Sequence, residues 1–387
     1  MTARISQQQL ESYLWGAAVL LRGTIDAGDY KQFIFPLLFY KRLCDVFDEE
    51  TRIALAESGG DKDFAAYPEN HRFQIPPDAH WREVRKAAKN VGRALQGAMR
   101  AIETANPDKL YGIFGDAQWT NKDRLSDAML RDLVEHFSGL DLTIAALPED
   151  ELGNGYEYLI KKFADDSGHT AAEFYTNRTV VHLMTEMLEP QPGESIYDPT
   201  CGSGGMLLSC IAHLHRHAQE WRNVRLYGQE RNLMTSSIAR MNCFLHGIED
   251  FRIERGDTLS EPKLVAGDKL MRFDVVLANP PYSIKQWDRE SLRLRPLGPQ
   301  RVRHAAAGPR RLCFLAAHPA EHDAEGWALR HPFPPRRAVP AGRGRHAQET
   351  HRGRPDRVRA GSRAESLLQL AHGSLHRHLP LGQSESA

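Results

Sequence analysis

An alternation of short apolar segments with helical segments constrains the fold of this chain more than any other feature. Strands are expected at residues 195–197, 224–227, 251–253 and 273–278, with helices at 179–188, 204–217 and 233–246. Strands that alternate with helices of about 10–15 residues predict an α/β fold with a doubly wound, mostly parallel, Rossmann-like sheet. Ligands of such sheets bind beyond the carboxyl ends of the strands. The unusual residues of this sequence lie at those ends.

Residues 1–150 have a helical pattern instead. Ser6-x-x-Gln9 matches a capping box that opens a helix, an apolar run with Pro36 covers 33–46, and an amphipathic stretch covers 125–140. This region holds no motif for a nucleophile or a metal. We therefore expect a helical N-terminal domain that docks other subunits or DNA, although a plain packed helical domain fits the pattern as well.

A glycine-rich turn, Asp198-Pro-Thr-Cys-Gly-Ser-Gly-Gly205, follows the first expected strand and opens a helix. Glycine lets a backbone approach a ligand closely, and a helix N-terminus offers unpaired N–H groups. The turn alone fits any nucleotide or a simple tight turn. Asp198, at the strand end, suits a cationic amino group better than a phosphate.

Two further acids follow the next strands. Glu230 ends the second strand, where a carboxylate can accept hydrogen bonds from both hydroxyls of a ribose. Taken alone, Glu230 could equally be a solvated loop residue. Asp257 follows the third strand, so the three acids are expected on one edge of the sheet.

The most specific motif is Asn279-Pro280-Pro281-Tyr282, directly after the apolar strand 273–278. An exocyclic purine amine is a poor nucleophile because its lone pair is delocalised into the ring. The Asn279 side-chain oxygen and the Pro280 carbonyl can accept both amine hydrogens, which localises the lone pair for attack on an electrophile. The prolines make the turn rigid, and Tyr282 offers a stacking face for a base taken out of the duplex.

At these residues the sequence resembles the S-adenosylmethionine-dependent amino-methyltransferases, and in detail the methylation subunit of type I restriction-modification systems. The resemblance covers about residues 4–290. It includes Leu10-Glu-Ser-Tyr-Leu-Trp15, the stretch 29–43, Tyr156-Glu-Tyr-Leu-Ile-Lys-Lys-Phe163 and Glu173-Phe-Tyr-Thr176. It implies a methyltransferase domain over 151–290 after the helical domain 1–150.

The resemblance also implies a role for each site residue. Phe174, Tyr175 and Thr176 would line the methionine end of S-adenosylmethionine, and Asp198 with Gly202, Ser203, Gly204 and Gly205 would hold its amino-acid part. Glu230 would bind the ribose and Asp257 the adenine edge. The catalytic residues would be Asn279, Pro280, Pro281 and Tyr282. Asn177 stands where the family often has proline, which removes no functional group.

The expected reaction is methyl transfer to N6 of adenine in DNA. Asn279 favours adenine over N4 of cytosine, and the sequence has no Pro-Cys motif for attack on C5 of cytosine. The expected partners are double-stranded DNA, a specificity subunit, a restriction subunit and a second copy of this chain. Two alternatives remain: a protein glutamine N5-methyltransferase, which shares Asn-Pro-Pro-Tyr, and an inactive scaffold subunit. Neither the target sequence nor the stoichiometry can be read from this chain.

Cysteines, histidines and apolar runs point to no metal and no membrane. The five cysteines are scattered and the longest apolar run near the N-terminus, 13–21, is too short to span a bilayer, so we expect a cytoplasmic protein. His213, His215 and His217 alternate on one expected helix. Without acids or cysteines nearby, we expect a solvated helix face there and no metal site.

The composition changes at Ser291. Residues 291–387 hold 17 Arg, 7 acidic residues and no Lys, whereas residues 1–290 carry a net charge of −10. Ile, Tyr, Met and Asn are also absent after Lys285, as expected when a GC-rich gene is translated out of frame. In the next frame, synonymous codons for Arg303–His318 and Trp327–Pro340 can spell family-like sequences. We therefore predict a frameshift near Ser291, a largely disordered or irregular segment 291–387, a sheet incomplete after strand four and doubtful activity.

Overall fold

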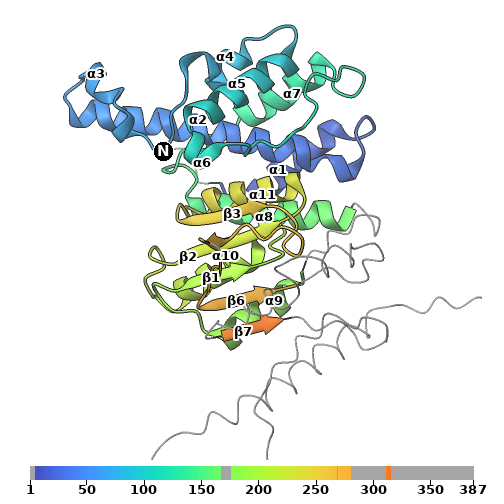
Figure 1. Ribbon diagram of the computed structural model, residues 1–387. Helices are drawn as coiled ribbons and strands as arrows, with labels where there is room; N and C mark the ends of the chain where they lie inside the picture. Colours follow the sequence, from blue (N-terminus) through green and yellow to red (C-terminus); the bar gives the residue numbers. More distant parts are fainter. Residues whose placement is uncertain (1–4, 167–175, 268, 280–310, 315–387) are drawn as a thin grey trace, which may run out of the picture. The chain divides into compact units, whose positions relative to one another are not determined.

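The computed structural model describes residues 5–166, 176–267, 269–279 and 311–314 (Figure 1). The chain divides into two compact units, Met1–Trp327 and Ala328–Ala387, and every described residue belongs to the first. Within these described ranges, no helix combines the length and the apolar character that a membrane crossing requires.

The N-terminal part is helical, as predicted. Helix α1 (Gln7–Leu21) begins at the predicted capping box, in which Ser6 Oγ accepts from Gln9 N at 3.3 Å and Gln9 Oε1 accepts from Ser6 N at 2.9 Å. The remaining helices before the sheet are η1 (Ala27–Asp29), α2 (Lys31–Glu57), α3 (Lys62–Ala65), η2 (Pro68–Asn70), η3 (Pro77–Ala79), α4 (Trp81–Arg85), α5 (Val91–Ala105), α6 (Pro107–Leu110), α7 (Asp127–Ser138) and α8 (Glu149–Asp166).

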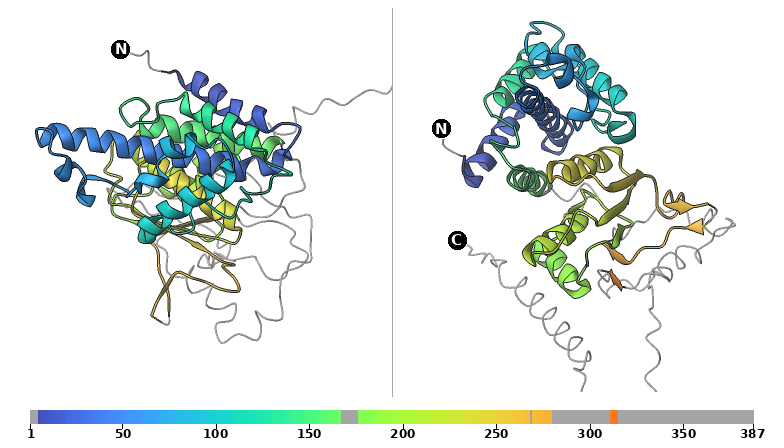
Figure 2. Two further views of the ribbon diagram at one scale, coloured as in Figure 1. Left: turned by 90° about the horizontal axis from the view of Figure 1, so that it is seen from above. Right: turned by 90° about the vertical axis from the view of Figure 1, so that its left-hand side faces the viewer.

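Helix α2 is longer than the predicted run 33–46, and Pro36 lies inside it. Proline removes one backbone hydrogen bond from a helix, but the apolar residues around Pro36 are almost fully buried, which offsets that loss. Tyr156 of α8 packs on Phe35 of α2 with ring centroids 4.4 Å apart. Helices α1, α2, α5, α7 and α8 lie together, with α11 (Leu233–Leu245) beside them (Figure 2). They share one apolar core, to which α11 contributes Ile238, Met241 and Leu245.

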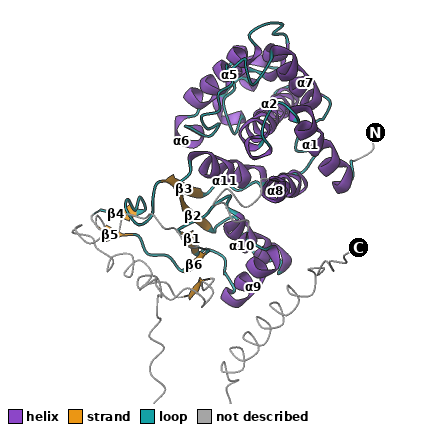
Figure 3. Ribbon diagram, turned by 90° about the vertical axis from the view of Figure 1, so that its right-hand side faces the viewer, coloured by secondary structure: helices purple, strands orange, loops and turns teal. Residues whose placement is uncertain are grey.

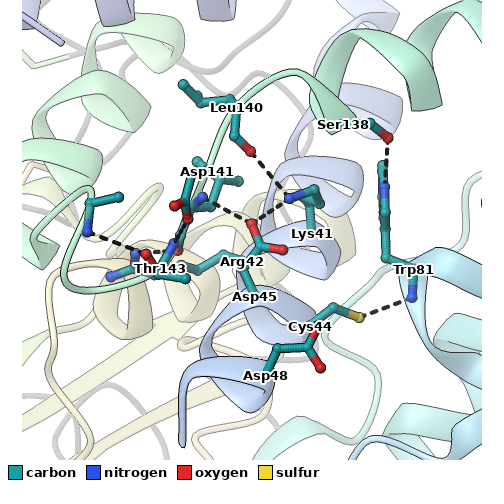
Figure 4. Close-up of polar contacts among 12 residues, drawn as sticks. Lys41, Arg42, Cys44, Asp45, Asp48, Trp81, Ser138, Leu140, Asp141 and Thr143 are labelled. Carbon is teal, nitrogen blue, oxygen red and sulfur yellow. Dashed lines mark hydrogen bonds and ion pairs between the residues drawn. The ribbon is translucent and has the colours of Figure 1, made fainter. Parts of the chain in front are cut away.

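A group of buried charges on α2 holds the connection between α7 and α8. Arg42 donates from Nη1 to the carbonyls of Leu142 and Leu147, the latter at 2.9 Å. Asp45 accepts from Leu142 N at 2.9 Å and pairs with Lys41, which also donates to Leu140 O (Figure 4). These hydrogen bonds satisfy the backbone of a segment without regular structure, so α2 determines where α8 begins.

The second part is the predicted α/β sheet. Its strands are β1 (Ser195–Asp198), β2 (Arg225–Glu230), β3 (Phe251–Arg255), β6 (Val275–Ala278) and β7 (Arg311–Phe314). They are parallel and lie in the order β3-β2-β1-β6-β7. The chain therefore builds outward from β1 to β3 and then returns to the other side of β1. This reversal makes the boundary between β1 and β6 the topological switch point of the sheet. A short antiparallel pair, β4 (Val265–Ala266) and β5 (Lys269–Leu270), was not predicted.

Three helices pack on one face of the sheet among the described residues: α9 (Arg178–Leu188), α10 (Gly205–Arg216) and α11 (Figure 3). Their apolar side chains meet alternate strand residues such as Ile196 of β1 and Leu226 of β2. Tyr197 and Val276 point to the opposite face, where Phe273 and Leu264 cover them. Helix α9 agrees with the predicted segment 179–188.

The prediction of an unpaired edge after the fourth strand is wrong. β7 pairs with β6 in parallel register, from Val275 opposite Arg311 to Ala278 opposite Phe314. Of the segment 291–387, residues 311–314 form this strand and the rest lies outside the described residues, so the prediction that the segment is largely disordered or irregular stays a prediction. Pairing is possible because a strand ladder uses backbone groups, which an unusual composition leaves in place.

Candidate active site

The candidate site begins where β1 and β6 end side by side. Asp198 is the last residue of β1, and Asn279 directly follows β6. Because Tyr197 pairs with Val276, both residues emerge at the carboxyl edge of adjacent strands. This is the switch point of the sheet, where a crevice is expected in an open α/β fold. The two most informative residues of the sequence therefore lie at one place.

The glycine-rich turn leads from β1 into α10 as predicted. Gly202 and Gly204 have φ values of 53° and 83°, a backbone region that favours glycine. A Cβ at Gly202 would meet no atom within 4 Å, so the turn leaves open space above it. Ser203 O accepts from the buried Asn242 of α11 at 3.0 Å, which anchors the turn from below. Such a turn can cradle a small polar ligand.

Cys201 packs inside this turn and is not a nucleophile. Its side chain is buried against Gly228 of β2, where a Cβ would come within 2.8 Å of the Cys201 sulfur. Burial raises the pKa of the Cys201 thiol well above its ordinary value. The thiol therefore stays protonated and unreactive, because only the thiolate attacks.

Asp198 is 2 % exposed, and its Oδ1 accepts a hydrogen bond from Thr200 N at 3.0 Å. Burial raises the pKa of Asp198 to about 7; the Thr200 N–H opposes this and the nearby Glu230 carboxylate adds to it. A buried carboxylate of this kind is best compensated by a cation. Among the described residues no Lys or Arg forms an ion pair with Asp198, so a cationic ligand group fits this position.

Glu230 ends β2, beside the glycine-rich turn. Its two carboxylate oxygens accept from Gly202 N at 3.1 Å and from Asn232 N at 2.8 Å. The carboxylate therefore connects the glycine turn of β1 to the start of α11. Its position beside that turn agrees with an acid that can also accept from ligand hydroxyls.

Asp257 lies farther along the same edge. Its Oδ1 accepts from Leu259 N at 2.9 Å and Ser260 N at 3.2 Å, and Arg231 lies 3.8 Å from Oδ2. A cavity of about 510 Å³ is lined by Arg231, Arg255, Gly256, Asp257, Ser260 and Glu261. This volume is within the range of small-molecule sites.

Asn279 is half-buried and donates from Nδ2 to Thr176 Oγ1 at 2.7 Å. Thr176 directly precedes Asn177, the residue that caps α9 through a 2.8 Å bond to Thr179 N. With its amide nitrogen bound to Thr176, Asn279 has its carboxamide oxygen as the atom that can accept from a substrate amine. Phe174, Tyr175, Pro280, Pro281 and Tyr282 lie outside the described residues, so their predicted roles stay predictions.

Sequence reasoning missed the residues that support the site from behind. Gln229 is fully buried and holds the loop after Asp257, donating to Glu261 O at 2.9 Å and accepting from Lys263 N at 3.1 Å. Arg178 donates to Gly205 O at 3.3 Å and pairs with Glu157 of α8. Such supporting residues can be recognised in the sequence as polar residues inside apolar segments, as Asn242 is in the core helix α11.

Comparison with known proteins follows the same division of the chain. Residues 10–137 match the family model described as the HsdM N-terminal domain, and residues 148–316 match the model described as N-6 DNA methylase.

Two curated relatives and one solved structure are similar over much of the chain. The type I restriction enzyme MjaIX methylase subunit of Methanocaldococcus jannaschii is 28% identical over 320 residues, covering 76% of this chain and 54% of the relative. The HindI methylase subunit of Haemophilus influenzae is 34% identical over 211 residues, which cover 52% of this chain and 46% of that relative. The structure of a type I restriction-modification methyltransferase subunit from Streptococcus thermophilus has a TM-score of 0.61 at 30% identity. The match covers 74% of this chain and 66% of that structure's chain. The chain spans about half the length of the curated relatives that it matches.

Proposed function

Because the chain belongs to the family of type I restriction-modification methylase subunits, we propose that it methylates N6 of adenine in DNA with S-adenosylmethionine as the donor. It would act as the modification subunit of a cytoplasmic type I complex. The observation that carries this proposal is the position of Asn279 directly after β6, at the switch point beside Asp198.

The chemistry at Asn279 is electrostatic. Its carboxamide oxygen would accept one hydrogen of the adenine amine, and the Pro280 carbonyl would accept the other. The amine lone pair then points away from the ring system and toward the methyl donor. The hydrogen bond between Asn279 and Thr176 supports this role, because it holds the side chain in one orientation. Tyr282 would stack on the base after it leaves the duplex.

The acids along the edge fit the parts of S-adenosylmethionine. When bound, this cofactor supplies an electrophilic methyl group on a sulfonium. The buried Asp198 would bind its ammonium group, and Gly202 to Gly205 would leave room for its amino-acid part. Glu230 would accept from the ribose hydroxyls, and Asp257 would contact the adenine edge. Phe174, Tyr175 and Thr176 would line the methionine end.

The charge of the chain supports a division of labour with other subunits. Residues 1–290 carry a net charge of −10, which disfavours tight autonomous binding to a polyanion. We infer that a specificity subunit reads the DNA sequence and that this chain docks to it, and to a second copy, through residues 1–150. A restriction subunit would complete the complex.

The test measures transfer of a tritiated methyl group from S-adenosylmethionine to duplex DNA, with and without a specificity subunit. Transfer to adenine only with that subunit is expected, and Asn279→Ala should abolish it while cofactor binding by calorimetry persists. Label on protein instead of DNA would favour a glutamine methyltransferase. Cofactor binding without any transfer, both in this chain and in one whose reading frame after codon 291 is restored, would support an inactive scaffold and contradict the proposal.

The unusual composition after Ser291 requires a second arm in this test. The chain as it stands is compared with one in which the reading frame after codon 291 is restored. Transfer by the restored chain alone would assign the loss to residues 291–387. Failure of both chains, with DNA and the specificity subunit present, would count against adenine methylation itself.

A further inference from the structure

A cluster of metal-ligand side chains lies on the helical side of the sheet, away from the candidate active site. Helices α9 and α10 each present a pair of residues four positions apart, which places both members on one helix face. The pairs are His182 with Glu186 on α9 and His213 with His217 on α10, where His217 is the C-terminal cap. Two such pairs on packed helices can enclose one ion.

The donor atoms of three of these residues converge. One ligand atom each from Glu186, His213 and His217 lies within 4.8 Å of the other two. His213 Nδ1 is 2.9 Å from Glu186 Oε1, and the rings of His213 and His217 are 4.2 Å apart. His213 is only 4 % exposed, so at least one donor is held in a fixed place. The prediction of a solvated helix face rested on the absence of acids, and Glu186 removes that ground.

The hydrogen bonding of His217 also prepares it as a ligand. Its Nδ1 lies 2.9 Å from His213 O. Because a carbonyl can only accept, the proton of the neutral ring is on Nδ1 and the lone pair is on Nε2. A histidine that donates its second nitrogen to a backbone carbonyl is the usual arrangement around protein-bound metals, since it fixes the ring and its tautomer.

We propose that Glu186, His213 and His217 form a binding site for a divalent transition metal, with Zn²⁺ as the expected ion. Two imidazoles and one carboxylate are a common zinc donor set, and they leave a fourth position open. His182 also lies close to this group, with Nδ1 3.6 Å from Glu186 Oε1. Mg²⁺ and Ca²⁺ prefer oxygen donors and should not bind here.

The Arg216 side chain would compete with the ion for Glu186. It lies 2.9 Å from Glu186 Oε1 and 3.1 Å from His182 Nδ1. Arg216 is 45 % exposed, so its guanidinium can move into solvent when a metal enters. This competition makes a distinctive prediction, because removal of a residue that is not a ligand should strengthen metal binding.

The bound ion would join α9 to α10 at the end opposite the catalytic edge. Helix α9 begins directly after Thr176 and Asn177, so a fixed α9 also fixes the hydroxyl that orients Asn279. The site is therefore expected to be structural. It should affect thermal stability more than it affects the chemistry.

The experiment titrates Zn²⁺ into the full-length, untagged chain after removal of metal. Calorimetry should give one site per chain, and Glu186→Gln and His217→Ala should each weaken binding at least about tenfold. Arg216→Gln should strengthen it. His215→Ala is the matched control. His215 lies between the two ligands in the sequence, but its ring contacts Trp221, with ring centroids 4.8 Å apart, so the change should leave metal binding unaltered.

A second readout separates this site from binding to cysteine. Co²⁺ at this donor set should give a visible absorption spectrum without the near-ultraviolet thiolate band. Zn²⁺ should also raise the melting temperature of the chain and of His215→Ala, but not that of His217→Ala. Binding that is unchanged in both His217→Ala and Glu186→Gln would overturn the proposal, as would a thiolate spectrum or no binding at all.

Discussion

Asp198 shows how a single buried carboxylate can connect stability to ligand binding. Its side chain is almost fully buried, and its pKa is raised to about 7, chiefly by burial. A raised pKa means that the folded chain holds a proton that the unfolded chain releases. The free energy of unfolding from this group therefore falls as the pH rises from about 4 to about 7.

Cofactor affinity should change in the opposite direction over the same range. The ionised carboxylate binds an ammonium group, so S-adenosylmethionine should bind more tightly as the pH rises, by up to about tenfold per unit below pH 7. Above about pH 8 the ammonium of the ligand loses its own proton and affinity should fall again. Calorimetry across this range measures the profile, and Asp198→Asn should lack its acidic limb. A flat wild-type profile below pH 7 would contradict the assigned role.

Thr176 should act on catalysis by positioning Asn279. Thr176→Val keeps the shape of the side chain but removes the acceptor for Asn279 Nδ2. We expect the turnover rate to fall about 10- to 100-fold through misplacement of the amide. Thr176→Ser keeps the hydroxyl and should stay close to wild type. A valine variant that weakens only cofactor binding would assign Thr176 to the cofactor alone.

At the scale of elements, residues with a local signal were predictable and residues held by distant partners were not. The capping box of α1 and the strands around the glycine turn follow from neighbouring residues. Helix α5 was missed because its first residues lack a local cap. Asp127 of α7 accepts from Asn90 N at 3.0 Å and Val91 N at 2.9 Å, so a distant residue caps this helix.

The same distinction applies to the candidate site. The placement of Asp198 and Glu230 at strand ends and of Asn279 directly after a strand was predictable, because parallel strands bring their carboxyl ends together. Gln229 was not, because its importance comes from a loop that folds back onto it. The hydrogen bond between Thr176 and Asn279 likewise joins residues 103 positions apart.

The buried charges on α2 give a test at this scale. Arg42→Leu should destabilise the chain by about 2 to 4 kcal/mol, because it leaves the carbonyls of Leu142 and Leu147 without their donor. Chemical denaturation measures the change. Arg82→Leu is a surface control, since Arg82 is 61 % exposed and should change stability by less than about 0.5 kcal/mol. If the two substitutions change stability equally, Arg42 does not stabilise the connection between α7 and α8.

The packing of β2 against the glycine-rich turn gives a second test of stability. Gly228→Ala should destabilise the chain by about 1 to 3 kcal/mol, because the new Cβ would lie 2.8 Å from the sulfur of Cys201. Cys201→Ala in the same chain removes that sulfur and should recover part of the loss. Two effects that simply add would show that the residues do not touch.

At the scale of the whole molecule, the change of composition at Ser291 falls inside the region that matches a family model. The family match to N-6 DNA methylase extends to residue 316, past the change at Ser291. A frameshift near that codon predicts that the nucleotide sequence contains a family-like continuation in the next frame. Sequencing of the gene decides this, and one uninterrupted frame with no alternative coding pattern would contradict it.

The pairing of β7 with β6 has a consequence for which sequences can form the edge of this sheet. The hydrogen bonds between these strands join main-chain amides and carbonyls, so they do not depend on which side chains the strands carry. An edge strand of many different sequences can thus pair with the sheet, whereas the chemistry next to that edge still depends on which side chains are present. Closure of the sheet edge and the identity of the catalytic residues are therefore separate requirements on the sequence.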